Sequence, residues 1–451
     1  MRPRNRSVFR TALGSAVVAC LGLACAAPRA PQGDARAQAD DLEVFTRDVL
    51  NVDRSYSTSA RADAEQRIAS LRADLGRVSD VRFVLTLAQI VALADNGHTV
   101  MLSRGVSPGL ARVGVRLTPF GEDFFVIRST TDHADLLGAR LVGVDDVPVV
   151  RLRAVARTLR GGVASWRDRS APLLLESPGQ LYAMGLTRSP SDATYRFETR
   201  SGAIRAVTLA PVTGPAETGD LVSVLDPRAG APGWQTLLAE DRAPWSLRQF
   251  DEPFRQRDAP ELDAIVIQLH ANIDAAGQSI AQFLEGADAA RRRAHRDNVV
   301  LDMRFNGGGN LQLTHAFMAS LPSRLPPTGR VVVLTSPWTF SAAISSVGYL
   351  KQAGADRVVL VGEAPGDRLQ FWAEGQPVRL PNSGALILIA TQRHDYLTGC
   401  RNFSDCHPYV RRFPITVTSL APEVAAPWTL DSYAAGRDPG MEAAARILRT
   451  R

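Results

Sequence analysis

Five short apolar runs in the C-terminal part of the chain constrain its fold most strongly. They lie at residues 264–269, 299–303, 331–334, 358–361 and 385–389. Residues near 277–296 and 341–353, between these runs, have helical periodicity. Buried strands that alternate with helices form mainly parallel sheets, because each right-handed crossover carries its helix onto a face of the sheet. The sequence therefore predicts an α/β domain over residues 261–451.

The middle of the chain has a different pattern. Short alternating strands are expected at 113–117, 123–128, 139–144, 193–197 and 204–209, with a helical stretch at 150–160. We therefore expect a small β-rich domain over residues 111–212. Residues 213–260 are rich in Pro, Gly and Asp and are expected to form a linker or irregular segment.

Residues 41–95 are expected to be helical. Phe83, Leu87 and Ile90 share one face at a spacing of three and four residues. Asn96-Gly97 is a good helix stop, and we expect an N-terminal helical domain over residues 41–110.

The first forty residues indicate export. Four arginines precede a small, apolar stretch at 11–27, which ends in the cleavage-like Ala24-Cys25-Ala26. The stretch is marginal for a membrane span, which needs about 20 residues. We expect a signal peptide at 1–26, a disordered leader at 27–40, and a protein in the periplasm or outside the cell. Lipidation of Cys25 is the alternative.

The cysteines agree with export. Of four cysteines, Cys20 and Cys25 lie in the export segment, which leaves Cys400 and Cys406. These two can close a small disulfide loop in an oxidising compartment; free thiols or half of a metal site are the alternatives. Because no Cys-x-x-Cys occurs, a zinc site is not expected.

The net charge does not indicate a nucleic-acid partner. Removing the four arginines of the export segment lowers it from +6 to +2. The remaining basic run, Arg291-Arg292-Arg293, has no aromatic residues interleaved with it. This pattern is typical of a solvated helix face.

Ser341 is the candidate nucleophile. It follows the strand expected at 331–334 and begins the next helix, where the helix dipole favours negative charge and the amide of Ala342 can donate to an oxyanion. The alternative is that Ser341 only caps the helix. The Gly-x-Ser-x-Gly pattern of the α/β-hydrolases is missing.

Two further segments carry candidate residues. Three consecutive glycines, at 307–309, follow the strand at 299–303 and can expose their amides to an anion; a plain tight turn is the alternative. His98 follows the Asn96-Gly97 helix stop and can point from its loop into a cleft. A purely structural histidine is the alternative there.

Together these motifs resemble one superfamily. They are Asp302-Met-Arg-Phe-Asn-Gly-Gly-Gly309, Thr339-Phe-Ser-Ala-Ala343, Val361-Gly-Glu-Ala-Pro-Gly366, Leu420-Ala-Pro-Glu-Val424 and Gly436-Arg-Asp-Pro-Gly-Met-Glu442. In this order they resemble serine peptidases related to tail-specific (C-terminal processing) proteases, the tricorn protease and interphotoreceptor retinoid-binding protein. Ala94-Asp-Asn-Gly-His-Thr99 is similar to the histidine segment of the tricorn-like branch. Residues 136–148 resemble the core of a PDZ-like domain, which the superfamily often places before its catalytic domain.

The resemblance implies a choice between two general bases. Tail-specific proteases use a lysine about 25 residues after the serine, whereas the tricorn-like branch uses a histidine with an acidic partner. The single lysine, Lys351, stands only ten residues after Ser341, about 15 Å along the helix. Gly366, Asp367 and Arg368 stand near the expected lysine position, and arginine is not a base at neutral pH. His98 is therefore the expected base, since imidazole exchanges protons near pH 7.

By this resemblance Ser341 attacks a carbonyl, and amides of Gly307 or Gly308 and of Ala342 hold the oxyanion. The family places its acid shortly before the tail motif, which favours Asp395. Asp405 and Glu363 are the next choices. Ile344 stands where many relatives carry glutamate, and the loop between the cysteines interrupts the region of the acid.

The sequence thus predicts an exported serine peptidase that acts on peptides or unfolded proteins and needs no cofactor or metal. Its PDZ-like domain would bind a peptide by adding it as a strand to a sheet edge. A non-catalytic binding protein of the same fold and an esterase remain the alternatives. Nothing in the sequence indicates an oligomeric state.

Overall fold

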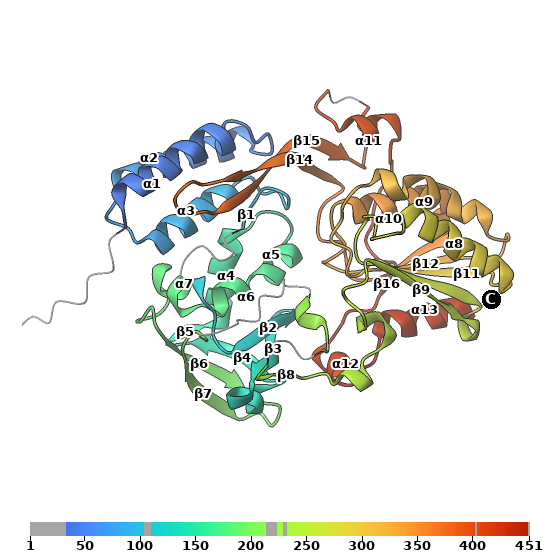
Figure 1. Ribbon diagram of the computed structural model, residues 1–451, viewed down its shortest axis with the longest axis horizontal. Coiled ribbons are helices and arrows are strands. Elements are labelled where there is room, and N and C mark those ends of the chain that lie inside the picture. Colours follow the sequence, from blue (N-terminus) through green and yellow to red (C-terminus); the bar gives the residue numbers. More distant parts are fainter. Residues whose placement is uncertain (1–32, 103–109, 213–222, 229–231, 402–403, 450–451) are drawn as a thin grey trace, which may run out of the picture. The chain divides into compact units, whose positions relative to one another are not determined.

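The computed structural model describes residues 33–102, 110–212, 223–228, 232–401 and 404–449 (Figure 1). The predicted signal peptide, with Cys25, lies outside the described residues. None of the helices in these ranges has both the length and the apolar character needed to cross a membrane.

The N-terminal part is helical, as expected. It consists of α1 (Ala35–Val44), the π-helix η1 (Phe45–Leu50), α2 (Thr58–Ala73) and α3 (Asp80–Ala92). Helix α1 starts inside the segment expected to be a disordered leader. It does so because the side chain of Asp34 accepts hydrogen bonds from the amides of Arg36 and Ala37, which satisfies two donors of the first turn. The side chain of Gln38 then bonds to Asp80 at the start of α3.

The middle part forms an antiparallel sheet. Its strand order is β2-β3-β4-β6-β7, and β5 and β8 pair at its sides. The strands are β2 (Val115–Phe120), β3 (Asp123–Thr130), β4 (Arg140–Val144), β5 (Val147–Pro148), β6 (Ala193–Glu198), β7 (Ile204–Leu209) and β8 (Trp234–Thr236). Helices α4 (Val149–Ala156), α5 (Ala164–Ser170), α6 (Pro172–Leu175) and α7 (Pro178–Ala183) lie between β5 and β6. Strand β8 comes from the segment expected to be a linker. The PDZ-like character of this part stays a prediction.

The C-terminal part contains the expected parallel sheet, and the α/β fold class is confirmed. The strand order is β16-β13-β12-β11-β10-β9, and only β9 is antiparallel to its neighbour. The strands are β9 (Phe254–Ala259), β10 (Ala264–Leu269), β11 (Asn298–Asp302), β12 (Val331–Thr335), β13 (Val358–Gly362) and β16 (Val424–Ala425). The sheet thus begins before residue 261, inside the expected linker.

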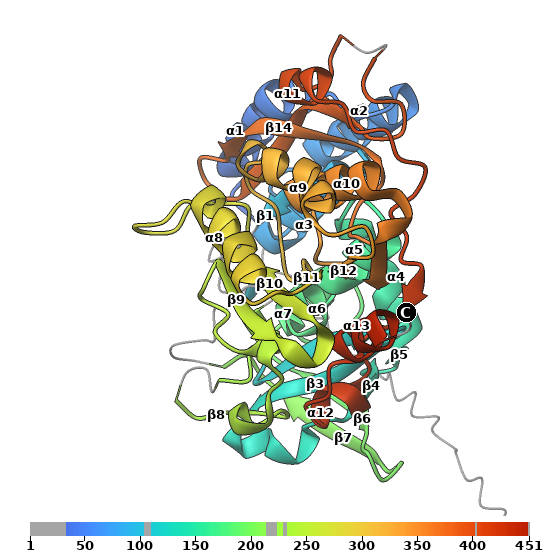
Figure 2. The same cartoon turned by 90° about the vertical axis from the view of Figure 1, so that its right-hand side faces the viewer.

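Helices cover both faces of this sheet (Figures 1 and 2). Helices α8 (Ile280–Arg293), α9 (Gln312–Arg324) and α10 (Ala342–Gly354) pack on one face, and α13 (Pro439–Arg449) packs on the other. Neighbouring residues of a strand point to opposite faces. Val331 and Val333 therefore join the first core, and Val332 and Leu334 join the second.

One expected strand belongs elsewhere. The run at 385–389 lies in β15 (Leu386–Asp395), which pairs antiparallel with β14 (Gln370–Arg379) and with β1 (Val100–Leu102) instead of joining the parallel sheet. Figure 1 shows this hairpin beside the N-terminal helices. Ile387 and Ile389 are buried there in the same core as Phe83 and Leu87 of α3. A short apolar run shows that a strand is buried, but it does not show which strand will pair with it.

A buried ion cluster closes the carboxyl end of β11. The Arg304 guanidinium bonds to Asp302 at 2.8 Å and to Asp438 at 2.7 Å, and all three side chains are buried. Ser246 also bonds to Asp438. Burial by itself raises the pKa of Asp438, but Arg304 outweighs this effect and holds that pKa below its usual range.

We predict that Asp438→Ala lowers the free energy of unfolding by about 3–5 kcal/mol, because it leaves part of a buried guanidinium charge uncompensated. The pKa of Asp438 is lower in the folded than in the unfolded chain. The ionised Asp438 therefore contributes to the free energy of unfolding above the pKa of about 4 that it has in the unfolded chain. This contribution is lost as the pH falls through the lower pKa of the folded chain. Urea unfolding at pH 7 and at lower pH measures both effects.

Asp146→Ala is the control, because Asp146 forms an exposed pair with Arg188; it should change stability by no more than about 0.5 kcal/mol. Equal effects of the two substitutions at pH 7 would contradict the prediction.

Candidate active site

Ser341 has an uncommon backbone conformation. It stands between β12 and α10 with φ 56° and ψ −128°, a region that residues other than glycine rarely adopt. Its side chain makes no capping hydrogen bond, although it is the N-cap residue of α10. The alternative that Ser341 serves as an ordinary helix cap is therefore not supported. Strain of this kind persists only where the surroundings enforce it, and it is common at functional sites.

Hydrogen bonds hold the residues before Ser341 in place. The amide of Phe340 donates to the carbonyl of Asn306 at 3.0 Å. The hydroxyl of Thr339 donates to the carbonyl of Met303 at 2.9 Å and accepts from the amide of Ser336 at 3.0 Å. These bonds tie the serine loop to the loop that follows the neighbouring strand β11.

The glycine loop lies directly against the serine. Gly308 has φ 108°, and a Cβ atom there would stand 2.5 Å from the Cβ of Ser341 and 3.1 Å from its Oγ. Gly309 has φ 128°, and a Cβ there would stand 2.5 Å from the carbonyl oxygen of Asn272. Only glycine permits these two approaches. The loop is therefore more than a tight turn, since it sets the distance between its own backbone and the serine hydroxyl.

Two of the predicted oxyanion donors have partners inside the protein. The Gly307 amide donates to the carbonyl of His270 at 3.3 Å, and the Gly308 amide donates to Oδ1 of Asn306 at 2.9 Å. The Ala342 amide stands in the first turn of α10, where the helix itself supplies no acceptor. The oxyanion role of these amides stays a prediction.

The loop that carries His98 is fixed by strand-like bonds. It connects α3 to β1, and Val100 in β1 pairs with Leu388 in β15. The Asn96 side chain attaches the loop to β14, because it donates to the carbonyl of Trp372 at 3.0 Å and accepts from the amide of Trp372 at 3.1 Å. Thr99 then bonds to the buried Asp53 at 2.8 Å. Both sides of His98 are thus anchored.

The β-rich part also contacts this loop. A Cβ atom at Gly161 would stand 2.7 Å from the amide nitrogen of Asn96. Arg167 of α5 forms an ion pair with Asp95, and Arg368 pairs with the same carboxylate at 2.8 Å. Two segments far apart in the sequence therefore hold Asp95 through opposite charge.

The imidazole of His98 lies between two phenylalanine rings. Its centroid is 4.3 Å from that of Phe340 and 5.0 Å from that of Phe371, and both pairs are stacked. Phe340 immediately precedes Ser341, and its ring also stacks on Trp166 of α5 at 3.6 Å. The structure therefore brings His98 beside the serine loop, 243 residues away in the sequence.

A carboxylate that the sequence analysis did not choose contacts this histidine. Oδ2 of Asp367 lies 3.4 Å from Nδ1 of His98, and the Asp367 side chain is 1% exposed. Asp367 stands near the position where tail-specific proteases carry lysine. An acidic residue at that position is the signal in the sequence that points to Asp367.

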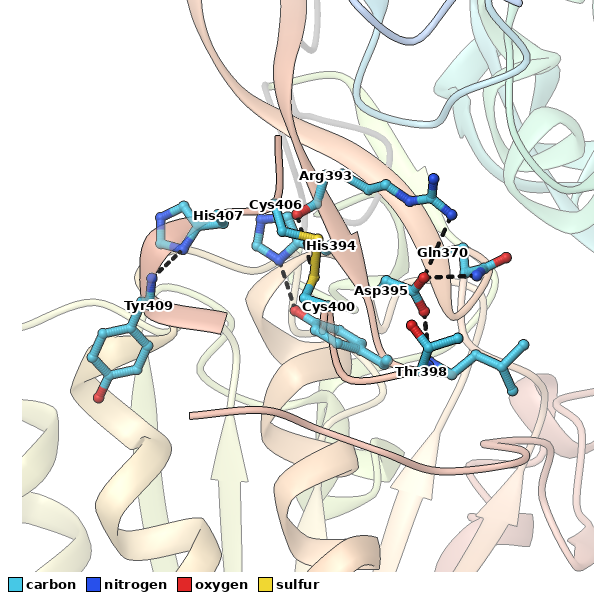
Figure 3. Close-up of a disulfide and its surroundings, with 11 residues drawn as sticks. Gln370, Arg393, His394, Asp395, Thr398, Cys400, Cys406, His407 and Tyr409 are labelled. Carbon is cyan, nitrogen blue, oxygen red and sulfur yellow. Dashed lines mark hydrogen bonds and ion pairs between the residues drawn. A yellow bond between two sulfur atoms is a disulfide. The ribbon is translucent and has the colours of Figure 1, made fainter. Parts of the chain in front are cut away.

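Asp395 has other partners (Figure 3). Its carboxylate accepts from Gln370 Nε2 at 2.9 Å and from the amides of Thr398 and Leu397 at 2.9 and 3.1 Å. Burial raises the pKa of Asp395, but these hydrogen bonds outweigh burial and lower it below its ordinary value. Its described bonds tie the end of β15 to the following turn and do not reach His98.

The described contacts of the other two candidate acids, Asp405 and Glu363, do not include His98. Asp405 is part of the loop between the cysteines, where its carbonyl accepts from the amide of Arg393 at 3.0 Å. Glu363 follows β13, and burial raises the pKa of its carboxyl group. Its backbone pairs with Thr335 at the end of β12.

The disulfide predicted from the sequence is present. Cys400 and Cys406 are bonded, with their Cα atoms 5.9 Å apart. Figure 3 shows the bond close to Arg393 and His394 of β15. The disulfide therefore closes the insertion onto the end of the hairpin. Within the described ranges, no group of three or more His, Cys, Asp or Glu side chains is arranged to hold a metal ion.

Known proteins were compared with this chain. No protein-family model matches it, and no curated protein does. Among solved structures, mature CPAF aligns with a TM-score of 0.57 and 14% identity over 92% of this chain and 97% of its own. Mature CPAF complexed with lactacystin aligns with a TM-score of 0.55 and 12% identity over 92% and 98%.

This chain has a CPAF-like fold. The alignment extends over nearly the whole of both chains, so the likeness includes the helical and β-rich parts as well as the parallel sheet. At this level of identity the likeness establishes the fold alone.

Lys351 stands away from these loops. Its ammonium group bonds to Glu423 at 2.5 Å and to the carbonyl of Val358 at 2.7 Å. Lys351 lies in the last turn of α10, whereas Ser341 precedes the first. The structure thus places Lys351 at the opposite end of the helix from the candidate nucleophile.

We predict that Asn96→Ala loosens the histidine loop, because it leaves both backbone groups of Trp372 without these partners. The free energy of unfolding should fall by about 1–3 kcal/mol, and amide exchange should accelerate over residues 94–99. Urea unfolding and hydrogen exchange with mass spectrometry measure the two effects. Exchange as slow as in the parent protein would contradict the prediction. Asn51→Ala, at an exposed position, is the matched control.

Proposed function

We propose that this protein is an exported serine peptidase with Ser341 as nucleophile, His98 as general base and Asp367 as the acidic partner. The observation that carries the proposal is the joint position of three segments. The strained serine, the histidine stacked on the residue before it, and a buried carboxylate 3.4 Å from that histidine lie together. The motif resemblance to peptidases and the CPAF-like fold support the reaction class.

In the proposed reaction, Ser341 Oγ attacks the carbonyl carbon of the scissile peptide bond while His98 accepts its proton. Asp367 faces Nδ1 of His98, so it favours the tautomer in which Nδ1 carries a proton and Nε2 is free to accept. It also stabilises the imidazolium that forms. His98 then returns the proton to the leaving amine, and water releases the acyl group by the same steps in reverse order.

The oxyanion would be held by the Ala342 amide and by an amide of the glycine loop. Gly308 is the glycine in closest approach to Ser341, but its amide already donates to Asn306. We propose that a substrate oxygen replaces Oδ1 of Asn306 as the acceptor. The Gly308 amide then exchanges its bond to Asn306 for a bond to the oxyanion. The new hydrogen bond is the stronger one, because its acceptor carries a charge.

The alternative of a non-catalytic binding protein has less support. A binding protein has no need to keep Ser341 in a strained conformation or to place a buried carboxylate behind His98. For substrate delivery we retain the PDZ-like domain as a proposal. Strand β2 is at the end of its sheet order, which leaves an edge for a peptide strand. Export, as the signal-like segment and the disulfide favour, remains part of the proposal.

The nucleophile and base are tested by labelling with a fluorophosphonate probe and by hydrolysis of a fluorescently labelled unfolded protein. We expect Ser341→Ala to abolish both signals. His98→Ala should lose nearly as much activity, because the two groups act as a unit. Lys351→Ala should change the activity little. An active His98→Ala variant, or an inactive but folded Lys351→Ala variant, would overturn the assignment of the base.

The acid is tested by a matched pair of isosteric changes. Asp367→Asn should lower kcat/KM about 100-fold or more, since it removes the charge that orients and stabilises the imidazolium. Asp395→Asn should lower thermal stability and leave kcat/KM within about threefold, because its hydrogen bonds serve the turn after β15. Measured kcat/KM values in the reverse order would assign the role to Asp395.

A further inference from the structure

A row of four polar side chains ends at the first turn of α10, the helix that follows Ser341. Glu374 Oε1 is 3.3 Å from Nε2 of His394, and Nδ1 of His394 is 2.9 Å from the hydroxyl of Tyr396. That hydroxyl is 2.6 Å from Oγ of Ser345. Neither the sequence motifs nor the proposed reaction uses any of these four residues.

The row joins the β14–β15 hairpin to α10, the helix that Ser341 precedes. Ser345 is in the first turn of α10, four residues after Ser341, and is buried against the core. Glu374 lies in β14, His394 lies near the end of β15 and Tyr396 follows it. The hairpin is thus tied to the helix of the nucleophile by side-chain hydrogen bonds.

The same hairpin also fixes the proposed base. The ring of Phe371 in β14 stacks on His394, with a centroid distance of 4.8 Å, and also on His98, with a centroid distance of 5.0 Å. A displacement of His394 would therefore be passed through one aromatic ring to His98. Because the row ends at Ser345, the hairpin holds both partners of the proton transfer.

The hydrogen bonds of this row have a defined direction. Burial raises the pKa of Tyr396, so its hydroxyl stays protonated. Burial lowers the pKa of His394, which favours the neutral ring. The bond from His394 lowers the pKa of Glu374, which stays ionised and only accepts. His394 therefore carries its proton on Nε2, Tyr396 donates to Nδ1, and Ser345 donates to Tyr396.

The backbone is distorted where Glu374 enters the row. Glu374 has φ 61°, and the pairing of β14 with β15 shifts its register at this residue. A bulge of this kind changes the direction in which a side chain points. A left-handed conformation is unfavourable for a glutamate inside a strand. We attribute the strained conformation of Glu374 to this bulge, which orients the carboxylate toward His394.

We infer that Tyr396 and His394 are positioning residues that keep the base and the nucleophile in register, by tying the β14–β15 hairpin to the first turn of α10. The inference rests on the proposed function. It requires no contact of either residue with the substrate. It predicts that cutting the row lowers the rate of the chemical step and leaves substrate binding unchanged.

The test is Tyr396→Phe, which removes one hydroxyl and with it the bonds to both neighbours. Tyr195→Phe is the matched control, because Tyr195 is also fully buried and donates one hydrogen bond, to the carbonyl of Leu175 at 2.9 Å, in the β-rich part. We expect Tyr396→Phe to lower kcat about tenfold or more with KM unchanged, because small displacements of reacting groups have large effects on rate. Tyr195→Phe should keep the parent kcat.

Further variants keep the outcomes distinct. Ser345→Ala cuts the row at its other end with less disturbance of the core, and it should lower kcat in the same direction. It decides the question if Tyr396→Phe does not fold. A parent kcat in either folded variant, or an equal fall in Tyr195→Phe, would overturn the inference and leave the proposed function intact. Absence of Ser341-dependent labelling in the parent protein would instead refute the proposed function.

Discussion

The pairing of β1 with β15 is the interaction on which the candidate site depends. It joins residues 100–102 to residues 386–388 by main-chain hydrogen bonds, and the Asn96 side chain makes a second attachment to the same hairpin at Trp372 of β14. His98 lies between these two attachments. Without the pairing, only side-chain contacts such as the stacking of His98 on Phe340 would connect the loop after α3 to the serine loop. The hairpin therefore sets the position of the base more than α3 does.

A second constraint is steric and acts at the carboxyl ends of the parallel strands. Neighbouring parallel strands end at one edge of the sheet, so the loops after β11 and β12 meet there. Gly308 lets them meet at a distance that any side chain would prevent. Bonds from Phe340 and Thr339 to the β11 loop then hold Ser341 in its unfavourable conformation. The buried pair of Arg304 and Asp438 supports the β11 loop from below.

Charge and burial distinguish the candidate acids. Asp367 is buried, and its Oδ2 has no hydrogen-bond partner among the described residues. Nδ1 of His98 lies 3.4 Å from this oxygen. Asp395 is equally buried, but its charge is satisfied by the side chains of Gln370 and Arg393 and by two amides. A carboxylate that already accepts several hydrogen bonds from its own turn has few lone pairs available to accept one from a catalytic histidine. Asp367, whose Oδ2 lies beside the imidazole without a hydrogen-bond partner, is therefore the better partner for His98. It stands in the segment that follows β13.

The sequence by itself determined the elements whose signals are local. Strands β10 to β13 and helices α8 and α10 follow from periodicity, because the spacing of apolar residues within a buried strand or an amphipathic helix indicates which side of the element is buried. Ser341, the glycine loop and the cysteine pair were found for the same reason, since each is a short pattern. The position of β15 was not found in this way, because its apolar run is compatible with either sheet.

Only the tertiary structure decided that β15 packs on the N-terminal helices, that Asp367 faces His98 across 269 residues of sequence, and that Ser345 joins Tyr396 and His394. These contacts depend on how separate elements pack, and no local pattern encodes the partner of a side chain.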